Sequence, residues 1–194
     1  MNIAVFASHG GSDLQAIIDA CKSGRLDAKV SVVISNNSKS MALKRAQASG
    51  IPAFHFSQKI IEDSQVLEDA ILKTLFEHDI QIIFLAGYLK KLGSSILKAF
   101  ENRVFNIHPS LLPKYGGKGM YGINVHEAVI KAKDTESGIT IHRVDGGYDT
   151  GEIIAQKIVP VLEGDTAEVL AARILEQEHI FIVDVLSDII NGKI

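Results

Sequence analysis

The sequence predicts an α/β fold in which helices cover both faces of a mostly parallel, twisted sheet. Short continuous apolar runs, such as residues 3–7 and 81–86, are typical of strands that are buried on both faces. Amphipathic helical patterns separate these runs, and a helical crossover is the usual connection between parallel strands. No stretch rich in proline or glycine resembles a linker, so we expect a single domain over residues 1–194.

The first hundred residues alternate between the two patterns. The expected elements in chain order are a strand at 3–7, a helix with Leu14, Ile17, Ile18 and Cys21 on one side, a strand at 30–34, a helix at 40–49, a strand at 53–56, a helix with Leu67, Ala70, Ile71, Thr74 and Leu75 on one face, and a strand at 81–86. This order predicts a Rossmann-like half.

The second half begins with a strand that ends in a distinctive polar string and continues through a glycine-rich loop. A short helix is expected at about 124–131, followed by strands at 138–144 and 152–159. Asp165, with Glu168 three residues later, is the expected cap of a last amphipathic helix, which Gly192 ends.

Composition narrows the class of protein. The 194 residues carry a net charge of −3, and the basic residues form no block, which argues against a nucleic-acid surface or a polybasic membrane anchor. Small molecules are therefore the expected partners. The one cysteine, Cys21, excludes an internal disulfide and fits a small core position in a reducing compartment. The opening residues lack a signal-peptide pattern, so we expect a cytoplasmic protein.

The run from Val104 to Pro113 is the most informative segment. Side chains alternate along a strand, so Asn106 and His108 point to the same face, and Pro109 stops the strand directly after them. Ligands of open α/β sheets bind at this carboxyl edge. An amide that stabilises an oxyanion beside an imidazole that moves a proton suits acyl transfer. The alternative is that Asn106 closes a turn and His108 is a half-buried structural histidine.

The loop at residues 8–13 joins the first strand to the first helix, where backbone N–H groups and the helix dipole can hold a phosphate. Neither the G-x-G-x-x-G spacing nor a Walker lysine is present, so NAD and ATP are poorly supported. Ser12 with Gln15 also fits a capping box, which needs no ligand. The sequence leaves both interpretations open.

A second loop, at residues 144–151, is rich in glycine and aspartate. A carboxylate from it could orient His108 and favour the protonated ring, but nothing local selects Asp149 over Asp145. The seven histidines show no H-E-x-x-H spacing, so we expect no metal. His126 and His142 are expected to be structural or solvent-facing.

Together these motifs resemble the glycinamide ribonucleotide formyltransferases of purine synthesis, which use 10-formyltetrahydrofolate as co-substrate. The resemblance runs almost end to end, and the string Asn-Ile-His-Pro-Ser-Leu-Leu-Pro at 106–113 is highly specific to folate-dependent formyltransferases. Other matching segments are Gly11-Ser12, the residues 14–18, the residues 85–89, and Asp149-x-Gly151 followed by Ile153-Ile154.

The resemblance implies a role for each matching position. His108 would be the general acid, Asn106 the oxyanion donor, and Asp149 the carboxylate that raises the histidine pKa. The residues implied to bind the ribonucleotide are Gly11, Ser12 and Asp13 at its phosphate, and Glu178 from the last helix. Those implied to bind folate are Leu89, Lys90, Lys91, Leu92 and Asn106, with the loop from Asp145 to Asp149.

Three positions depart from the better-known form of the family. Asp13 stands where an asparagine usually contacts phosphate, Lys90 replaces an arginine, and the basic residue expected near Ser64 and Gln65 is missing. The alternatives within enzymes are a 10-formyltetrahydrofolate hydrolase, a sugar-amine formyltransferase and a methionyl-tRNA formyltransferase. The alternative outside enzymes is a silent nucleotide-binding module. A monomer and a homodimer are both compatible with the sequence.

Overall fold

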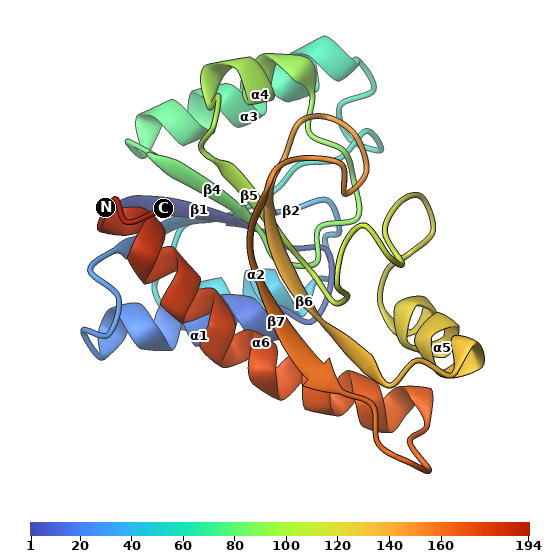
Figure 1. Ribbon diagram of the computed structural model, residues 1–194. Helices are drawn as coiled ribbons and strands as arrows, with labels where there is room; N and C mark the ends of the chain where they lie inside the picture. The colour runs from blue at the N-terminus through green and yellow to red at the C-terminus, as the bar shows by residue number, and fades with distance from the viewer. The chain divides into compact units, whose positions relative to one another are not determined.

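The computed structural model describes all residues from Met1 to Ile194, and it contains seven strands and six helices (Figure 1). In chain order the elements are β1 (Asn2–Phe6), α1 (Ser12–Lys22), β2 (Lys29–Ser35), α2 (Met41–Ala48), β3 (Ala53–His55), α3 (Ser64–Glu77), β4 (Ile82–Leu85), α4 (Ser94–Ala99), β5 (Val104–His108), α5 (Ile123–Ala132), β6 (Glu136–Arg143), β7 (Ile153–Pro160) and α6 (Ala167–Ile190). The strands form one sheet in the order β3-β2-β1-β4-β5-β6-β7. This confirms the predicted α/β class.

The chain divides into two compact units, residues 1–105 and residues 106–194. In the first unit, β1 pairs in parallel with β2 and with β4, and β2 pairs in parallel with β3. Helices α1 and α2 lie on one side of these strands and α3 and α4 on the other (Figure 1). The side chains from Ile3 to Phe6 are fully buried, as the uninterrupted apolar run at this position predicts.

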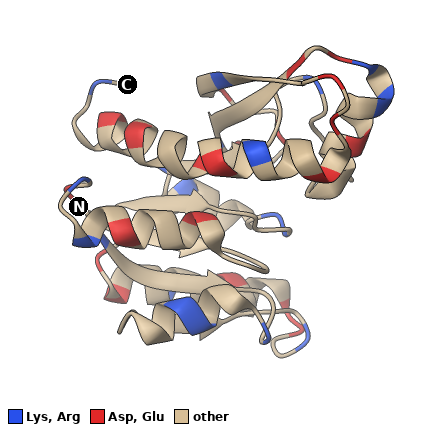
Figure 2. Ribbon diagram, turned by 90° about the horizontal axis from the view of Figure 1, so that it is seen from below, with Lys and Arg blue, Asp and Glu red and all other residues tan.

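The second unit contains the end of β5, the antiparallel pair β6–β7, and helices α5 and α6. The long helix α6 packs against β6, β7 and α5. Its buried apolar residues include Leu170, Ile174, Ile182 and Leu186. Acidic and basic residues are interspersed along both units (Figure 2). None of the helices combines the length and apolar composition needed to span a membrane.

Two features of the helices differ from the expectations. Helix α4 was not predicted, because its six residues are too few to show a helical period. The cap of α6 is Thr166, whose side chain accepts a hydrogen bond from the Val169 N–H, so the prediction of Asp165 as the cap is wrong. Asp165 instead accepts the Leu162 N–H and binds Arg173 through both carboxylate oxygens.

The expected ends of the other elements agree with the structure to within a few residues. Gly192 follows the C-cap Asn191 with φ of 66°, a left-handed conformation that glycine adopts without strain, so it ends α6 as predicted. Cys21 lies in α1 as an unpaired cysteine and is partly buried. The expectation of one domain over residues 1–194 stays a prediction.

Candidate active site

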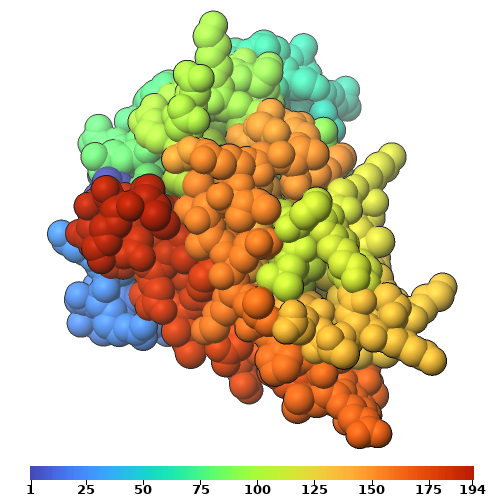
Figure 3. Space-filling view, viewed as in Figure 1, coloured from blue at the N-terminus to red at the C-terminus, as the bar shows by residue number.

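β5 carries Asn106 and His108 at the carboxyl end of the strand. His108 is buried, with 4% of its surface exposed, and Asn106 is half-buried. Pro109 follows directly, and the chain continues through a long loop in which the Leu112–Pro113 peptide bond is cis. On the surface this loop lies beside the β6–β7 pair (Figure 3), where the Gln156 side chain donates a hydrogen bond to the Leu112 carbonyl. The predicted placement of the two polar side chains at the carboxyl end of the strand is thus confirmed.

Two acceptors face the ring of His108, one at each nitrogen. The distance from Nε2 to the carbonyl oxygen of Tyr115 is 2.8 Å, which is a hydrogen bond. The distance from Nδ1 to Oδ2 of Asp149 is 3.6 Å, which is within ion-pair range but too long for a good direct hydrogen bond. A protonated imidazole can satisfy both neighbours because both of its nitrogens are then donors.

The structure distinguishes the two candidate carboxylates, which the sequence could not. Asp149 faces His108, whereas Asp145 accepts hydrogen bonds from the Gly147 N–H and the Thr150 hydroxyl and so shapes its own turn. These bonds hold the pKa of Asp145 below its usual value, with the Gly147 N–H contributing most. Asp145 therefore supports the loop, and Asp149 is its member that reaches the imidazole.

Asp149 is held from several sides. Its Oδ2 accepts a hydrogen bond from the Gly117 N–H at 2.9 Å, and its Oδ1 lies 3.6 Å from Nε2 of His142. Burial is the largest single influence on the pKa of Asp149 and raises it, but His142, His108 and the Gly117 N–H together lower it below the usual value. The carboxylate is therefore ionised at neutral pH.

His142 belongs to this cluster, which the sequence analysis missed. Only 2% of its surface is exposed, so of the two roles expected for it, structural or solvent-facing, the solvent-facing one is excluded. Its Nδ1 lies 2.7 Å from the Arg143 carbonyl oxygen and its Nε2 lies 3.0 Å from Nδ2 of Asn106. With Nδ1 protonated, Nε2 accepts from the Asn106 amide and fixes the direction of its N–H groups. The one signal in the sequence is the position of His142 at the end of the strand that leads into the aspartate loop.

The pKa of His108 is lowered from its usual value, mainly because burial disfavours the charged ring. Asp149 and the Tyr115 carbonyl oppose this by stabilising the protonated ring, while His142 adds to the lowering. The expectation that Asp149 raises the histidine pKa thus holds for its own contribution but not for the net shift, which is downward.

His126 is a further buried histidine near this group. It lies in α5, 4% exposed, and its Nδ1 has no hydrogen-bond partner. Its pKa is lowered, first by burial and then by His108. Like His142 it is not solvent-facing, and its packing on the inner side of α5 fits the structural role that the sequence allowed.

The loop at residues 8–13 in the first unit ends in the N-terminus of α1. Gly11 is the N-cap and has φ of 68°, and a Cβ at this position would lie 2.8 Å from Cβ of Ala42 in α2. No side chain caps this helix, so the capping box expected from Ser12 and Gln15 does not form. The Gln15 side chain instead bonds to Asp19 and Arg45. The first N–H groups of α1 lack partners within the helix, as an anion site requires.

The other predicted binding residues lie in different elements. Leu89 donates its backbone N–H to the Ser8 hydroxyl, which brings the start of the 89–92 segment next to the loop at 8–13. Lys90 and Lys91 are exposed, whereas the Leu92 side chain is buried. Glu178 is buried on α6 in the second unit. The chain holds no group of three side chains with the arrangement of a metal site.

The chain is similar to known proteins along almost its whole length. The sequence profile described as "Formyl transferase" matches residues 1–186. A protein of Vigna unguiculata named phosphoribosylglycinamide formyltransferase, chloroplastic, is 44% identical over 99% of this chain, which spans 62% of that protein's length. The Bacillus subtilis phosphoribosylglycinamide formyltransferase is 37% identical over 97% of this chain and 94% of its own length.

The structural comparison agrees with the sequence comparison. The crystal structure of glycinamide ribonucleotide transformylase 1 from Geobacillus kaustophilus superposes with a TM-score of 0.90 at 39% identity and covers 97% of both chains. The profile match, the full-length relative and the shared fold lead to the same conclusion: the chain belongs to the formyl transferase family.

Proposed function

We propose that this chain is a phosphoribosylglycinamide formyltransferase, which transfers the formyl group of 10-formyltetrahydrofolate to the glycinamide amine of 5′-phosphoribosylglycinamide in purine biosynthesis. The observation that carries the proposal is the cluster of Asn106, His108 and Asp149 in a member of the formyl transferase family. The names of the bacterial and plant relatives support the choice of substrate.

The reaction requires groups that stabilise an oxyanion and move a proton, and the cluster supplies both. The substrate amine attacks the formyl carbon, and the resulting oxyanion accepts a hydrogen bond from the Asn106 amide, whose orientation His142 fixes. Protonated His108 acts as the general acid: it gives its proton to N10, the bond between N10 and the formyl carbon breaks, and tetrahydrofolate leaves. The proton lost by the attacking nitrogen restores the charge of the ring.

Asp149 stabilises the protonated form of the buried His108 ring. Burial alone would leave the imidazole neutral at working pH, and the ionised carboxylate 3.6 Å from Nδ1 offsets part of that cost. The carboxylate also keeps the ring in one orientation, because the Gly117 N–H holds it in place. Its role is to position and charge the imidazole, and it does not exchange the proton with substrate itself.

We further propose that Gly11, Ser12 and Asp13 bind the substrate phosphate through the backbone at the N-terminus of α1. Gly11 allows the close approach of the backbone, and the helix dipole favours an anion. The Asp13 carboxylate adds a negative charge in the first turn, so the phosphate is bound through N–H groups rather than through this side chain. Glu178 is proposed to contact the ribonucleotide.

The folate is proposed to lie beside residues 89–92, with Asn106 and Asp145 among its neighbours. Because the Leu92 side chain is buried, this residue offers only its backbone, while the exposed Lys90 and Lys91 offer charge to an acidic folate tail. Lysine lacks the bidentate geometry of arginine, so this attraction depends strongly on salt. No other cofactor and no metal takes part in the proposal.

The experiment that tests the proposal is formyl transfer from 10-formyltetrahydrofolate, followed spectroscopically with and without phosphoribosylglycinamide. Turnover that requires the ribonucleotide is the expected result. Equal loss of formyl groups without it would identify a hydrolase, and binding of both ligands without turnover would identify a silent module. The remaining expectations, a cytoplasmic location and a monomer or homodimer that binds neither nucleic acid nor membranes, stay predictions.

A further inference from the structure

We infer that Tyr115, anchored through its hydroxyl to Asp134, is a positioning residue that keeps a proton on Nε2 of His108, so that the proton His108 gains and loses is the one on Nδ1. The inference rests on the proposed function for its kinetic consequences only. Its structural content concerns the second unit alone, from the loop after β5 to the start of β6.

The contact with the imidazole sets the position of the proton. The Tyr115 carbonyl and the ionised Asp149 carboxylate can both only accept, but the carbonyl lies 2.8 Å from Nε2 whereas the carboxylate lies 3.6 Å from Nδ1, too far for a good direct hydrogen bond. The hydrogen of the neutral ring is therefore held on Nε2. The second proton can then be added only at Nδ1. That nitrogen faces Oδ2 of Asp149 at 3.6 Å, a separation that leaves it available to exchange its proton.

The carbonyl is held in this direction by an uncommon backbone conformation. Tyr115 has φ of 59°, in the left-handed region that residues other than glycine adopt only at an energetic cost. Asp149, the other partner of the ring, has φ of 57°. Aspartate adopts this region more readily than tyrosine, so the strain lies at Tyr115, and such strain persists only where the surrounding contacts impose it.

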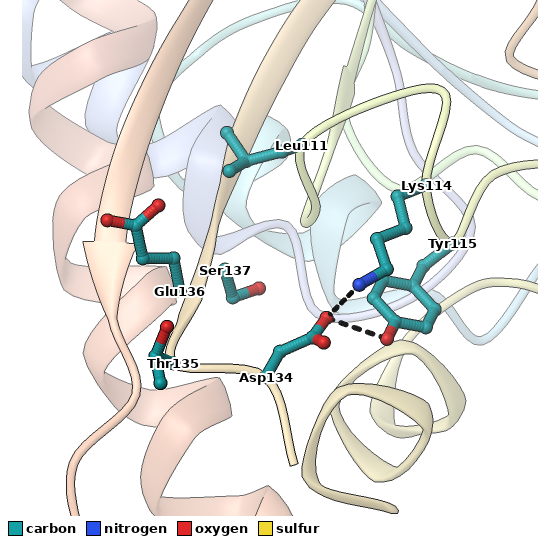
Figure 4. A pocket seen from close by; sticks show the side chains of 7 residues that line it. All are labelled: Leu111, Lys114, Tyr115, Asp134, Thr135, Glu136 and Ser137. Atoms are coloured by element: carbon teal, nitrogen blue, oxygen red, sulfur yellow. Dashed lines mark hydrogen bonds and ion pairs between the residues drawn. The ribbon is translucent and has the colours of Figure 1, made fainter. Parts of the chain in front are cut away.

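The contacts that hold Tyr115 in this conformation are made at its side-chain hydroxyl and at the neighbouring backbone. The hydroxyl donates to Oδ2 of Asp134 at 2.8 Å, and Nζ of Lys114 reaches the same oxygen at 2.5 Å (Figure 4). On the backbone side, the Ser110 hydroxyl donates to the carbonyl of Lys114 at 2.6 Å. Tyr115 therefore links Asp134, through its hydroxyl, to the catalytic imidazole, through its backbone carbonyl.

The two bonds to Asp134 come from donors that differ in exposure to water. They lie at an open pocket of about 270 Å³ that Leu111, Lys114, Tyr115 and residues 134–137 line (Figure 4). The Lys114 side chain is 60% exposed, so its ion pair gains little in water, whereas the Asp134 side chain is only 19% exposed. The hydrogen bond from the tyrosine hydroxyl is accordingly the anchor, and Lys114 is secondary.

The groups that set the charge of His108 can be separated from this anchor. The charged and titratable side chains that act on the ring are Asp149, His142 and His126, and none of them contacts the tyrosine hydroxyl. Tyr115→Phe therefore leaves all three in place and removes only the anchor. The backbone carbonyl is still present in the variant, but it is no longer fixed.

The test is ¹⁵N–¹H NMR of the His108 ring as a function of pH, together with kcat and KM for formyl transfer. In the wild-type protein we expect the neutral ring to carry hydrogen on Nε2. In Tyr115→Phe we expect a mixture of the two neutral tautomers, titration of His108 at lower pH, and a kcat reduced about three- to tenfold with both KM values kept within about twofold. The matched control is Tyr121→Phe, which removes the hydroxyl of an exposed tyrosine in the same loop.

Substitutions at the other end identify the anchor. Asp134→Ala should reproduce the changes seen in Tyr115→Phe. Asp134→Asn should stay close to wild type in the NMR spectrum and in kcat, because the amide oxygen still accepts the hydrogen bond from the tyrosine hydroxyl. Lys114→Met should also stay near wild type. A neutral wild-type ring with hydrogen on Nδ1 would overturn the inference, and so would a Tyr115→Phe variant that matches Tyr121→Phe in the NMR spectrum and in kcat. If the wild type transfers no formyl group, the proposed function fails, and the NMR comparison still decides the role of Tyr115.

Discussion

His108 is the side chain on which the proposed chemistry depends most directly. We expect His108→Ala to lower kcat by about 100- to 10,000-fold, the usual range for loss of a general acid. Binding of a stable deazafolate analogue should change little, because the imidazole acts on the reacting atoms. Steady-state kinetics and calorimetric titration measure the two quantities, with His55→Ala in β3 as the control. A variant that retains near-normal kcat would rule out the assigned role.

Asp149 and Asp145 provide a matched pair for testing which carboxylate charges the ring. Asp149 raises the pKa of His108 against the effect of burial, so Asp149→Asn should lower this pKa further. The fraction of His108 that is protonated then falls at each pH near and above the new pKa, and the alkaline decline of kcat moves to lower pH. Asp145→Asn should leave the decline in place, since that carboxylate bonds to Gly147 and Thr150. Identical profiles for the two variants would contradict the assignment.

Sequence alone could select Asn106 and His108, because strand alternation and a following proline are local signals. It could not select Asp149, assign His142 or find the Tyr115 carbonyl. These contacts depend on how the two loops fold, and the left-handed conformation of Tyr115 is rare for tyrosine and has no local signature. The sequence therefore predicts the imidazole but not the residues that position it.

Strands and helices were more predictable than their ends. Every strand and five of the six helices follow from apolar periodicity, whereas α4 is too short to show a period. The predicted N-caps were wrong at two helices, for different reasons. Asp165 and Thr166 are both favoured cap residues, but the Asp165 carboxylate is paired with Arg173 of the same helix, and Thr166 is the cap. At α1 the glycine before Ser12 took the cap position.

The approach of α1 to α2 leads to a prediction about Gly11. A methyl group there meets both a left-handed backbone and Ala42, at 2.8 Å from its Cβ and 2.9 Å from its Cα. Gly11→Ala should therefore destabilise the protein by about 2–5 kcal/mol and weaken phosphate binding. Gly24→Ala is the control, because it has φ of 75° but no atom within 4 Å of the added carbon, and should cost only about 1–2 kcal/mol.

Denaturant unfolding and phosphate titration of the two variants measure this difference. An equal loss of stability in Gly11→Ala and Gly24→Ala would show that the contact with α2 carries no cost. Normal phosphate affinity in a folded Gly11→Ala protein would count against the loop at residues 8–13 as the phosphate site.

The whole chain offers a test of its domain organisation. The boundary between the two compact units falls after Phe105, inside strand β5, rather than in a linker. A strand cannot remain half-paired without exposing backbone N–H and C=O groups, so unfolding of either unit removes the support of β5 in the other. We therefore expect one cooperative thermal transition, with equal calorimetric and van't Hoff enthalpies.

Ligands sharpen the same measurement. A stable deazafolate analogue and phosphoribosylglycinamide, each at about a hundred times its dissociation constant, should each raise stability by about 2.7 kcal/mol. In a protein of this size that corresponds to a rise in Tm of roughly 5–10 °C. In a single domain the ribonucleotide shifts the only transition as a whole. Two transitions, with only one moving when the ribonucleotide is added, would mean that the units fold independently, and the expectation of one domain would then be wrong.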